Sequence, residues 1–391
     1  MYQNILVINL MHLGDLMLVT PVLRTLRANY PRAHISLLAD KKLADLVQYN
    51  EHLDECLFID KKGKDDHFGS LGRFILGLRK KKYDLVINLH RNERASALAA
   101  FSGAKRIVGY SKPGFSLFFD KVMQNPSIAH HVADGPFAFL KKARYVPGWK
   151  HQVHAHLEVL REAVGVTKID DGGLEMWLSE EMESRAEALW QESFSAGDKV
   201  IALNIGASWE TKRWLDSYFA ECADEFLREG YAVAFLGGPM DREIVEKCLA
   251  GMEEKASPKL KVFTGKVGLG VLGGILKRCV LFLTTDSGPM HIGVAMHTPI
   301  VTMFGASPVP GFYPYDAKDI LIKAPEPCHP CGIHKCPKEG AANLACMKNI
   351  PVATVMKYCH QLLEETGARP ACELPGPTEY ECRVIDLAEQ P

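Results

Sequence analysis

The first residues that could take part in catalysis or binding lie in a short polar segment directly after the first apolar run. His12, Gly14 and Asp15 follow the run at 5–8, and Thr20-Pro21 then opens a predicted helix. A carboxylate at a strand-to-helix turn is where a general base for a substrate hydroxyl would be placed. An aspartate at such a turn equally serves as a helix cap or a loop residue, so both interpretations of Asp15 stay open.

A second segment, GASWETKRW at 206–214, combines a hydroxyl with two cations after another apolar run. Ser208 and backbone donors could orient a diphosphate, while Lys212 or Arg213 could neutralise the charge that develops on it. The spacing of glycine and lysine is not that of a Walker loop. A solvated loop in which Trp214 packs is the alternative.

A third segment runs from Thr284 to His291. Small polar residues end a predicted strand, and Gly288-Pro289 begins a helix whose free amide groups favour an anion. His291 lies about one turn further on, where it either faces the same ligand or is structural. After another apolar run, Asp241 could accept hydrogen bonds from ribose hydroxyls or cap the next helix.

Two series of short apolar runs alternate with helical periodicity, which is typical of parallel sheets covered by helices on both faces. The fold class is therefore α/β, with two doubly wound units. The predicted strands are 5–8, 35–38, 56–59, 85–89, 200–204, 232–236, 262–264, 281–284 and 300–304. The predicted helices are 21–29, 71–82, 153–164, 215–229, 241–250, 269–278 and 288–296.

The break between the two units is predicted near the Asp-Asp-Gly-Gly turn at 170–173. We expect an N-terminal unit over 1–172, a C-terminal unit over 173–350, and a helix with a proline-containing tail over 351–391. A ligand would sit in the cleft between the units, at the carboxyl ends of the strands.

Charge is divided unevenly along the 391 residues, although the net charge is only -1. Residues 1–170 carry 25 Lys and Arg against 16 Asp and Glu, so the N-terminal unit is basic and the remainder acidic. The basic stretches 79–82 and 141–144 are either solvated helix ends or attract anionic lipid or a phosphorylated glycan. Because no basic motif is interleaved with aromatics, we expect no nucleic-acid partner.

No apolar stretch is long enough to span a membrane, and no signal sequence is evident. The sequence therefore predicts a cytoplasmic protein that is either soluble or peripheral to a membrane. Cys328, Cys331, Cys336 and Cys346 cluster near the end, and they could be reduced thiols, metal ligands or disulfides. Because the cytoplasm is reducing and reduced thiols are one of these alternatives, we predict no metal site. No paired aspartates of the DxD type stand in a convincing loop, which is consistent with a metal-independent reaction.

Four motifs in combination resemble glycosyltransferase family 9, which contains the bacterial lipopolysaccharide heptosyltransferases. They are GDLMLVTP at 14–21, GASWETKRW at 206–214, GGPMD at 237–241 and TDSGPMHIG at 285–293. The resemblance covers roughly 3–365, and the opening stretch is most like the heptosyltransferase III group. It implies two Rossmann-like domains facing across a cleft (GT-B type), inversion at the sugar, and neither a metal nor another cofactor.

The resemblance also implies the substrates. The donor would be ADP-L-glycero-D-manno-heptose, and the acceptor would be the lipid-linked inner core oligosaccharide of lipopolysaccharide. The enzyme would then work at the cytoplasmic face of the inner membrane, against an anionic surface. A related enzyme with another donor sugar, a sugar-nucleotide epimerase and a nonenzymatic glycan-binding protein are the alternatives.

Residue by residue, Asp15 matches the family's catalytic aspartate and Lys212 the lysine that contacts the donor diphosphate. The other donor-binding positions implied by the match are Ser208, Asp241, Val267, Asp286, Ser287, Gly288 and His291. Asn9 stands where relatives often have a basic residue, and Ala207 where some have a second threonine.

The basic N-terminal unit is expected to bind the acceptor, because its positive charge suits a phosphate-rich and acidic glycan. The residues proposed to contact the acceptor are His12, His90, Arg91, Arg94, Lys105 and Arg106. His12 is also the competitor of Asp15 for the role of general base.

Overall fold

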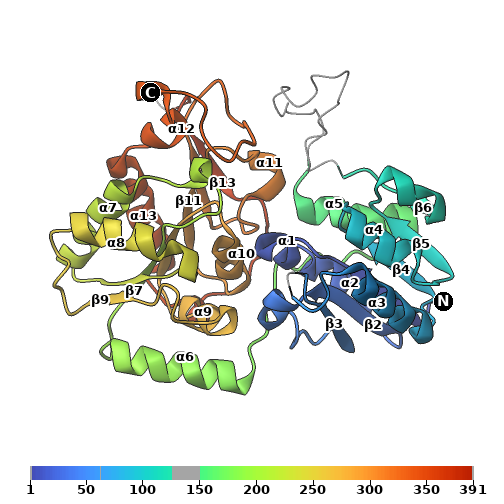
Figure 1. The fold of residues 1–391 in the computed structure, drawn as a ribbon. Helices are drawn as coiled ribbons and strands as arrows, with labels where there is room; N and C mark the ends of the chain where they lie inside the picture. The colour runs from blue at the N-terminus through green and yellow to red at the C-terminus, as the bar shows by residue number, and fades with distance from the viewer. Residues whose placement is uncertain (1, 62, 126–149, 390–391) are drawn as a thin grey trace. The chain divides into compact units, whose positions relative to one another are not determined.

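The computed structural model describes residues 2–61, 63–125 and 150–389. The chain forms two compact units, each built on its own parallel sheet (Figure 1). The first contains residues up to 127 and Lys150–Trp177, and the second contains Leu178–Pro391. The predicted α/β class with two doubly wound units is therefore confirmed. The basic stretch at 141–144 lies outside the described residues.

The first unit has a six-stranded parallel sheet in the order β3-β2-β1-β4-β5-β6. Its two central strands are apolar except for one asparagine at an end of each, Asn4 and Asn88, because helices cover both faces of the sheet. The strands are β1 (Asn4–Ile8), β2 (His34–Asp40), β3 (Glu55–Ile59), β4 (Leu85–Asn88), β5 (Arg106–Gly109) and β6 (Lys121–Val122). The helical segments are α1 (Leu13–Met17), α2 (Thr20–Asn29), η1 (Lys41–Leu46), α3 (Phe68–Lys81), α4 (Glu93–Ala100), η2 (Pro113–Phe118), α5 (Gln152–Val159) and η4 (Leu160–Val164).

The second unit has a seven-stranded parallel sheet in the order β13-β12-β11-β10-β7-β8-β9. The strands are β7 (Val200–Asn204), β8 (Ala232–Phe235), β9 (Leu260–Val262), β10 (Leu281–Thr285), β11 (Ile300–Met303), β12 (Ile320–Lys323) and β13 (Arg383–Asp386). The longer helices are α6 (Glu180–Ser193), α7 (Asp216–Arg228), α8 (Arg242–Gly251), α9 (Leu269–Leu276), α10 (Gly288–Ala295) and α13 (Val352–Thr366). The short helical segments are η5 (Glu210–Lys212), η6 (Pro239–Asp241), α11 (Val309–Phe312), η7 (Gly340–Ala342), α12 (Ala345–Lys348) and η8 (Ala371–Glu373).

The C-terminal segment is more ordered than the predicted tail. The expected helix is α13, which buries Val355, Cys359 and Leu362 in the core of the second unit. Beyond it, β13 pairs in parallel with β12 and forms the outer strand of the sheet. The prediction of a tail was wrong for β13, because this edge strand is defined by backbone pairing rather than by a run of apolar residues.

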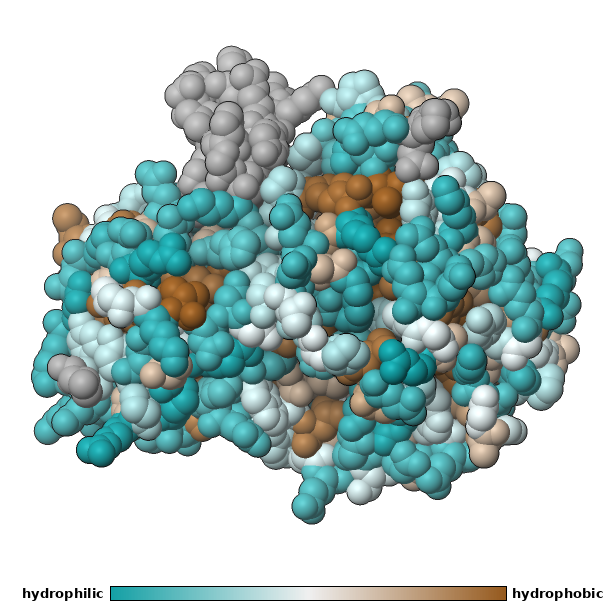
Figure 2. Space-filling view, turned by 180° about the vertical axis from the view of Figure 1, so that it is seen from behind, coloured by the Kyte–Doolittle hydropathy of each residue, from teal (hydrophilic) through white to brown (hydrophobic). Residues whose placement is uncertain are grey.

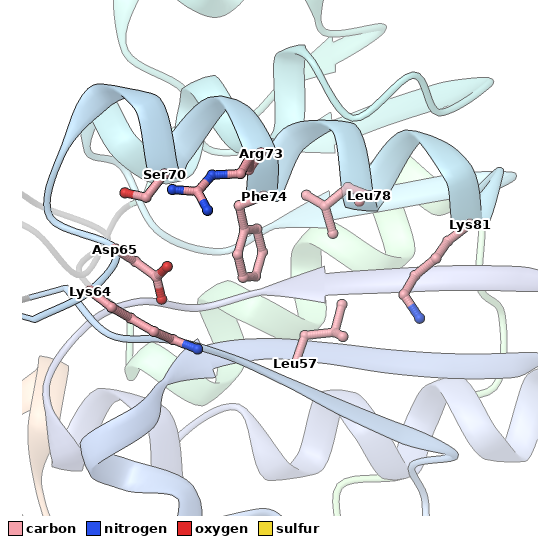
Figure 3. A pocket seen from close by; sticks show the side chains of 9 residues that line it. Leu57, Lys64, Asp65, Ser70, Arg73, Phe74, Leu78 and Lys81 are labelled. Carbon is pink, nitrogen blue, oxygen red and sulfur yellow. The ribbon is translucent and has the colours of Figure 1, made fainter.

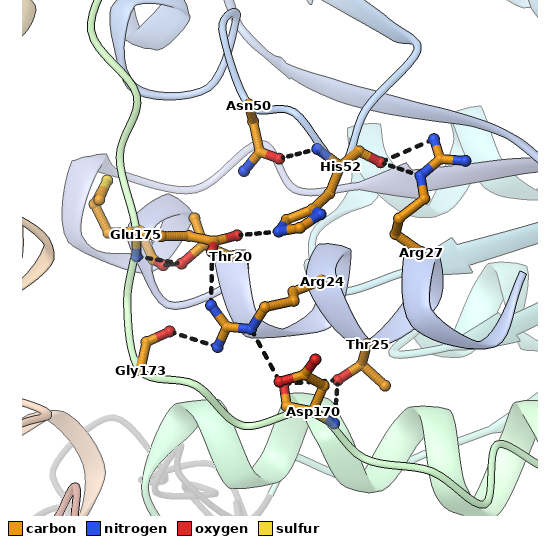
Figure 4. A network of polar contacts seen from close by, with 10 residues as sticks. Thr20, Arg24, Thr25, Arg27, Asn50, His52, Asp170, Gly173 and Glu175 are labelled. Carbon is orange, nitrogen blue, oxygen red and sulfur yellow. Dashed lines mark hydrogen bonds and ion pairs between the residues drawn. The ribbon is translucent and has the colours of Figure 1, made fainter. Parts of the chain in front are cut away.

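The end of the first unit is fixed by a polar network around Arg24 of α2 (Figure 4). Its guanidinium binds Asp170 at 3.2 Å and Glu175 at 2.6 Å, and donates to the carbonyl oxygen of Gly173 at 2.9 Å. Three contacts from one arginine fasten the predicted breaker segment to α2. The first unit therefore extends to Trp177 rather than ending at 172.

A helix that spans a membrane must be both long and apolar. Over the described ranges, no helix combines the length and the apolar character that crossing a bilayer requires. The face seen in Figure 2 is mostly hydrophilic, with separate small hydrophobic areas.

Candidate active site

In the second unit, the loops that follow β7 and β10 lie side by side at the carboxyl edge of the sheet. β7 pairs with β10 on one side and with β8 on the other, so the strand order reverses at β7. A crevice at the strand ends next to such a reversal is the usual ligand site of doubly wound sheets. The sequence segments 206–214 and 284–291 therefore meet where a ligand is expected.

Asn204, the last residue of β7, ties the two loops together. Its side-chain nitrogen donates to the Ser287 hydroxyl at 2.9 Å and to the carbonyl oxygen of Gly206 at 3.1 Å. Thr285 donates to the same carbonyl at 2.9 Å. The side-chain oxygen of Asn204 is buried and has no hydrogen-bond partner among the described residues. The sequence motifs did not single out Asn204, although a polar residue ending a buried strand was visible there.

Lys212 is held between a carboxylate and an aromatic ring. Its ammonium lies 2.9 Å from a carboxylate oxygen of Asp286 and 4.7 Å from the centre of the Trp209 ring. The Asp286 side chain is 4% exposed and that of Lys212 is 20% exposed, so the ion pair is largely shielded from water. Trp209 also stacks on His334, with 4.1 Å between the ring centres. A cation is thus positioned at the sheet edge with little conformational freedom.

The start of α10 adds backbone donors beside this cation. Ser287 is the N-cap residue, but no side chain caps the first turn of this eight-residue helix. Uncapped amide groups at a helix start attract an anion. His291 follows within the helix, and burial lowers its pKa to about 4, so the imidazole is neutral at pH 7. Its Nδ1 atom is buried without a hydrogen-bond partner in the described part of the chain.

Asp241 has a structural contact in this unit. It accepts a hydrogen bond from the backbone amide of Gly238 at 2.8 Å, which caps η6. Burial raises its pKa, and the nearby Arg213 opposes that effect. A Cβ on Gly206 would lie only 2.0 Å from the carboxylate, so this glycine makes room for Asp241. Asp241 is also the N-cap residue of α8 but makes no side-chain capping bond to that helix, so the predicted capping of the helix at 241–250 was wrong, and its carboxylate caps η6 instead. Contact with a ribose stays a prediction.

Two further predicted donor residues lie on loops of the same edge. Ser208 is exposed, beyond the end of β7. Val267 is half-buried, between β9 and the start of α9. Their positions agree with a ligand on this edge.

In the first unit, Asp15 lies in α1, just beyond the carboxyl end of β1. Its carboxylate is 3.8 Å from Nδ1 of His12, whose side chain is 96% exposed while that of Asp15 is 15% exposed. Lys61 donates to the carbonyl oxygen of Leu10 at 2.6 Å. Burial, with Lys61 and His12 nearby, lowers the pKa of His90 to about 3. Lys61, which the sequence analysis did not select, therefore belongs to this edge.

The structure separates the residues predicted to bind the acceptor. Arg91 is exposed beyond the carboxyl end of β4. Arg94 pairs with Asp66 at 3.1 Å and donates to the carbonyl oxygen of Lys61 at 3.3 Å. Lys105 and Arg106, however, lie at the amino end of β5, on the opposite edge of the same sheet.

Lys105 and Arg106 have partners at that opposite edge. Lys105 pairs with Asp84 at 2.7 Å. Arg106 donates to the Tyr2 hydroxyl at 2.6 Å and to the carbonyl oxygen of Ala163 at 2.7 Å. The prediction placed Lys105 and Arg106 beside Arg91 because they are close in sequence to the carboxyl end of β5. They stand at the start of that strand, however, which lies on the opposite edge of the sheet. Neither residue is included in the site proposed below.

A cavity of about 450 Å³ opens elsewhere in the first unit, between β3 and α3 (Figure 3). Phe74, Leu78 and Leu57 lie in its middle, with Lys64 and Arg73 towards one end and Lys81 at the other. None of the predicted site residues lines it. The candidate donor site lies instead among the loops at the carboxyl edge of the second sheet.

The four clustered cysteines are free thiols. Burial, together with the neighbouring Cys328, Cys331 and Cys336, raises the pKa of Cys346 to about 12, so the four thiols share one region. His334 of this segment supports Trp209, which links the cysteine segment to the position of Lys212. Over the described ranges, the group with metal-ligand geometry is elsewhere, at Glu225, Glu229 and His360.

Two parallel α/β units, one of which gathers a lysine and an uncapped helix start at its strand ends, define a GT-B glycosyltransferase architecture. A family model described as glycosyltransferase family 9 (heptosyltransferase) matches residues 71–342. This match spans more than half of the chain. The chain therefore belongs to glycosyltransferase family 9, as its motifs predicted, and it is a glycosyltransferase.

Individual relatives agree with this assignment. Lipopolysaccharide heptosyltransferase 3 of Escherichia coli (strain K12) is 27% identical over 308 residues, covering 75% of this chain and 80% of the relative. A glycosyl transferase family 9 structure from Veillonella parvula DSM 2008 has 33% identity and a TM-score of 0.77, covering 93% of this chain and 98% of that one. The E. coli ADP-heptose LPS heptosyltransferase II structure has 21% identity and a TM-score of 0.73, covering 93% and 100%.

Proposed function

We propose that this enzyme transfers heptose from ADP-L-glycero-D-manno-heptose to the inner core of lipopolysaccharide, with inversion at the anomeric carbon. The observation that carries the proposal is the shielded pair of Lys212 and Asp286 beside the uncapped start of α10. Family membership supports heptose as the sugar. One relative is named for ADP-heptose and another for lipopolysaccharide, which supports the donor and the acceptor.

The second unit would bind and activate the donor. Lys212 and the backbone amides at Ser287 and Gly288 offer positive charge where the diphosphate would lie. These donors stabilise the leaving ADP most strongly when the sugar–phosphate bond breaks and negative charge develops on its terminal oxygen. Neutral His291 and the unpartnered amide oxygen of Asn204 add polar atoms that accept hydrogen bonds without adding charge. Asp241 and Val267 are proposed to contact the ribose and the adenine.

The first unit would bind the acceptor and remove its proton. In the proposed step, the acceptor hydroxyl oxygen attacks the anomeric carbon, its proton passes to the Asp15 carboxylate, and ADP leaves. Asp15 is 15% exposed, so it is accessible to a substrate yet partly shielded from water. Arg91, Arg94 and His12, all on the carboxyl edge, are proposed to contact the acidic acceptor. No metal or other cofactor is proposed for the reaction.

The acceptor is lipid-linked in this proposal, so the enzyme would work at the cytoplasmic face of the inner membrane. The direct test is incubation of the full chain with ADP-heptose and a core oligosaccharide, followed by mass spectrometry of the product. The addition of one heptose supports the proposal. Addition of another sugar from a parallel ADP-hexose or UDP-hexose reaction, with none from ADP-heptose, would reject the proposed donor.

Nucleotide selectivity gives an independent check on the donor. ADP is expected to raise the melting temperature of the protein more than UDP or GDP at equal concentration, because only the favoured nucleotide binds the folded state tightly. Equal shifts for the three nucleotides would mean that the second unit recognises the diphosphate without the adenine.

A further inference from the structure

An exposed apolar cluster lies at the edge of the first sheet where the strands begin, which is the amino edge. The proposed transfer reaction has no role for this cluster. The η2 segment returns from β5 beside α4, and Phe118 lies with its ring centre 5.2 Å from that of Phe101. Phe115 anchors the segment by packing on the core and on Phe101. The next residues face water: Leu117 is 92% exposed and Phe118 is 49% exposed. A leucine so exposed beside exposed aromatics commonly marks an interaction surface.

Cations border this cluster. A Cβ on Gly103 would lie 3.3 Å from Cγ of Arg79, so the Arg79 side chain lies against the chain two residues beyond Phe101. Lys80 and Lys82 are exposed at the same end of α3. In the part of the chain that the structure describes, these three side chains have no ion-pair partner. Lys81 of the same run pairs with Glu55 at 2.5 Å, so Arg79, Lys80 and Lys82 are the residues that present unneutralised charge next to the apolar cluster.

We propose that this basic–apolar edge, made of Phe101, Leu117, Phe118, Arg79, Lys80 and Lys82, docks on a bilayer containing acidic phospholipids. Leucine and phenylalanine side chains enter the interfacial region of a bilayer, and adjacent arginine and lysine contact lipid phosphates. This combination favours a lipid surface over a protein partner, because the unpaired cations match the negative charge of the lipid phosphates and the exposed Leu117 can enter the apolar layer below them.

The position of the edge agrees with the proposed function, on which this inference rests for its lipid-linked acceptor. The edge lies at the amino end of β5, whereas Asp15 follows the carboxyl end of β1 in the same parallel sheet. A strand of four residues separates the two edges by about 13 Å, before the loops are counted. Docking through the amino edge therefore leaves the opposite edge, with Asp15, uncovered by the membrane.

The test is sedimentation of the full chain with vesicles of phosphatidylcholine alone and with vesicles that also contain phosphatidylglycerol. We expect binding to the acidic vesicles and a fall with added salt. Leu117→Ser with Phe118→Ser, and separately Arg79→Ala with Lys80→Ala, should each weaken it about ten-fold or more. Tyr49→Ser controls for an exposed aromatic of the same unit, and Lys41→Ala with Lys42→Ala controls for the loss of two charges.

Equal binding by wild type and both double variants would overturn the inference, as would equal binding to the two kinds of vesicle. A concentration-dependent dimer that Leu117→Ser abolishes, without any vesicle binding, would assign the edge to a second copy of the chain and also overturn it. An unchanged melting temperature and an unchanged response to ADP show that the variants remain folded. Retained ADP binding with lost vesicle binding would leave the proposed transfer function unaffected.

Discussion

Removal of the Lys212 ammonium should weaken ADP binding strongly. The group is 20% exposed and lies 2.9 Å from Asp286, whose side chain is 4% exposed. Loss of a hydrogen bond to a charged group costs about 1.5–3 kcal/mol. In Lys212→Ala, the unpaired Asp286 carboxylate would also repel the diphosphate, which places the loss near the upper end of that range. We therefore expect the Kd for ADP to rise about 100-fold.

Isothermal titration calorimetry measures this change directly. Lys247→Ala is the matched control, because this lysine of the same unit pairs with Glu243 on the exposed face of α8. A second variant separates charge from packing: Lys212→Ala combined with Asp286→Asn should recover part of the lost affinity, since the repelling carboxylate is gone. An unchanged Kd in Lys212→Ala, or no recovery in the double variant, would refute the electrostatic reasoning.

Three other predictions concern the acceptor, the support of Lys212 and pH. Arg91→Ala should raise the KM for the acceptor several-fold and leave the KM for the donor unchanged in steady-state kinetics; a defect in the donor alone would place Arg91 elsewhere. His334→Ala should weaken ADP binding about three- to ten-fold, because loss of the stacked ring frees Trp209, and His334→Phe should restore it; equal affinity in all three proteins would contradict this role. Burial lowers the pKa of His156 to about 3. Below about pH 6.5 the imidazole is therefore protonated in the unfolded chain but stays neutral in the folded protein, so the free energy of unfolding should fall as the pH drops. From about pH 7 to pH 5, the free energy of unfolding measured with urea should fall by about 2 kcal/mol less in His156→Gln than in wild type. An identical fall in both proteins would contradict this assignment.

Much of the fold could be predicted from the sequence, because buried parallel strands are short apolar runs. The predicted strand at 200–204 coincides with β7, and the helix at 288–296 is α10 to within a residue. Two of the missed strands, β6 and β13, lack that signal, whereas β5 and β12 were missed although their buried residues are mainly apolar. β6 has two exposed residues, and the outer strand β13 has only two apolar residues, which stand between Arg383 and Asp386. Both are strands because a neighbouring strand offers backbone partners, which a local pattern cannot reveal.

The candidate site was less predictable than the fold. Lys212 and Asp286 were selected from separate motifs, but their ion pair depends on β7 and β10 being adjacent in the sheet. His334 supports Trp209 from a segment that the cysteine pattern alone had marked. Arg106 was wrongly grouped with the site because it is close in sequence to the carboxyl end of β5, whereas it lies at the amino end of that strand. Sequence distance within one strand does not say which edge a side chain occupies.

The central claim is that Asp15 accepts the proton of the acceptor hydroxyl, and single-turnover kinetics of Asp15→Asn test it most directly. Asparagine keeps the size of the side chain but cannot take a proton, so the rate of heptose transfer should fall by about 100-fold or more while ADP binding is retained. His12→Ala, which removes the exposed neighbour 3.8 Å away, should keep most of the rate. A near-normal rate in Asp15→Asn together with its loss in His12→Ala would contradict the account.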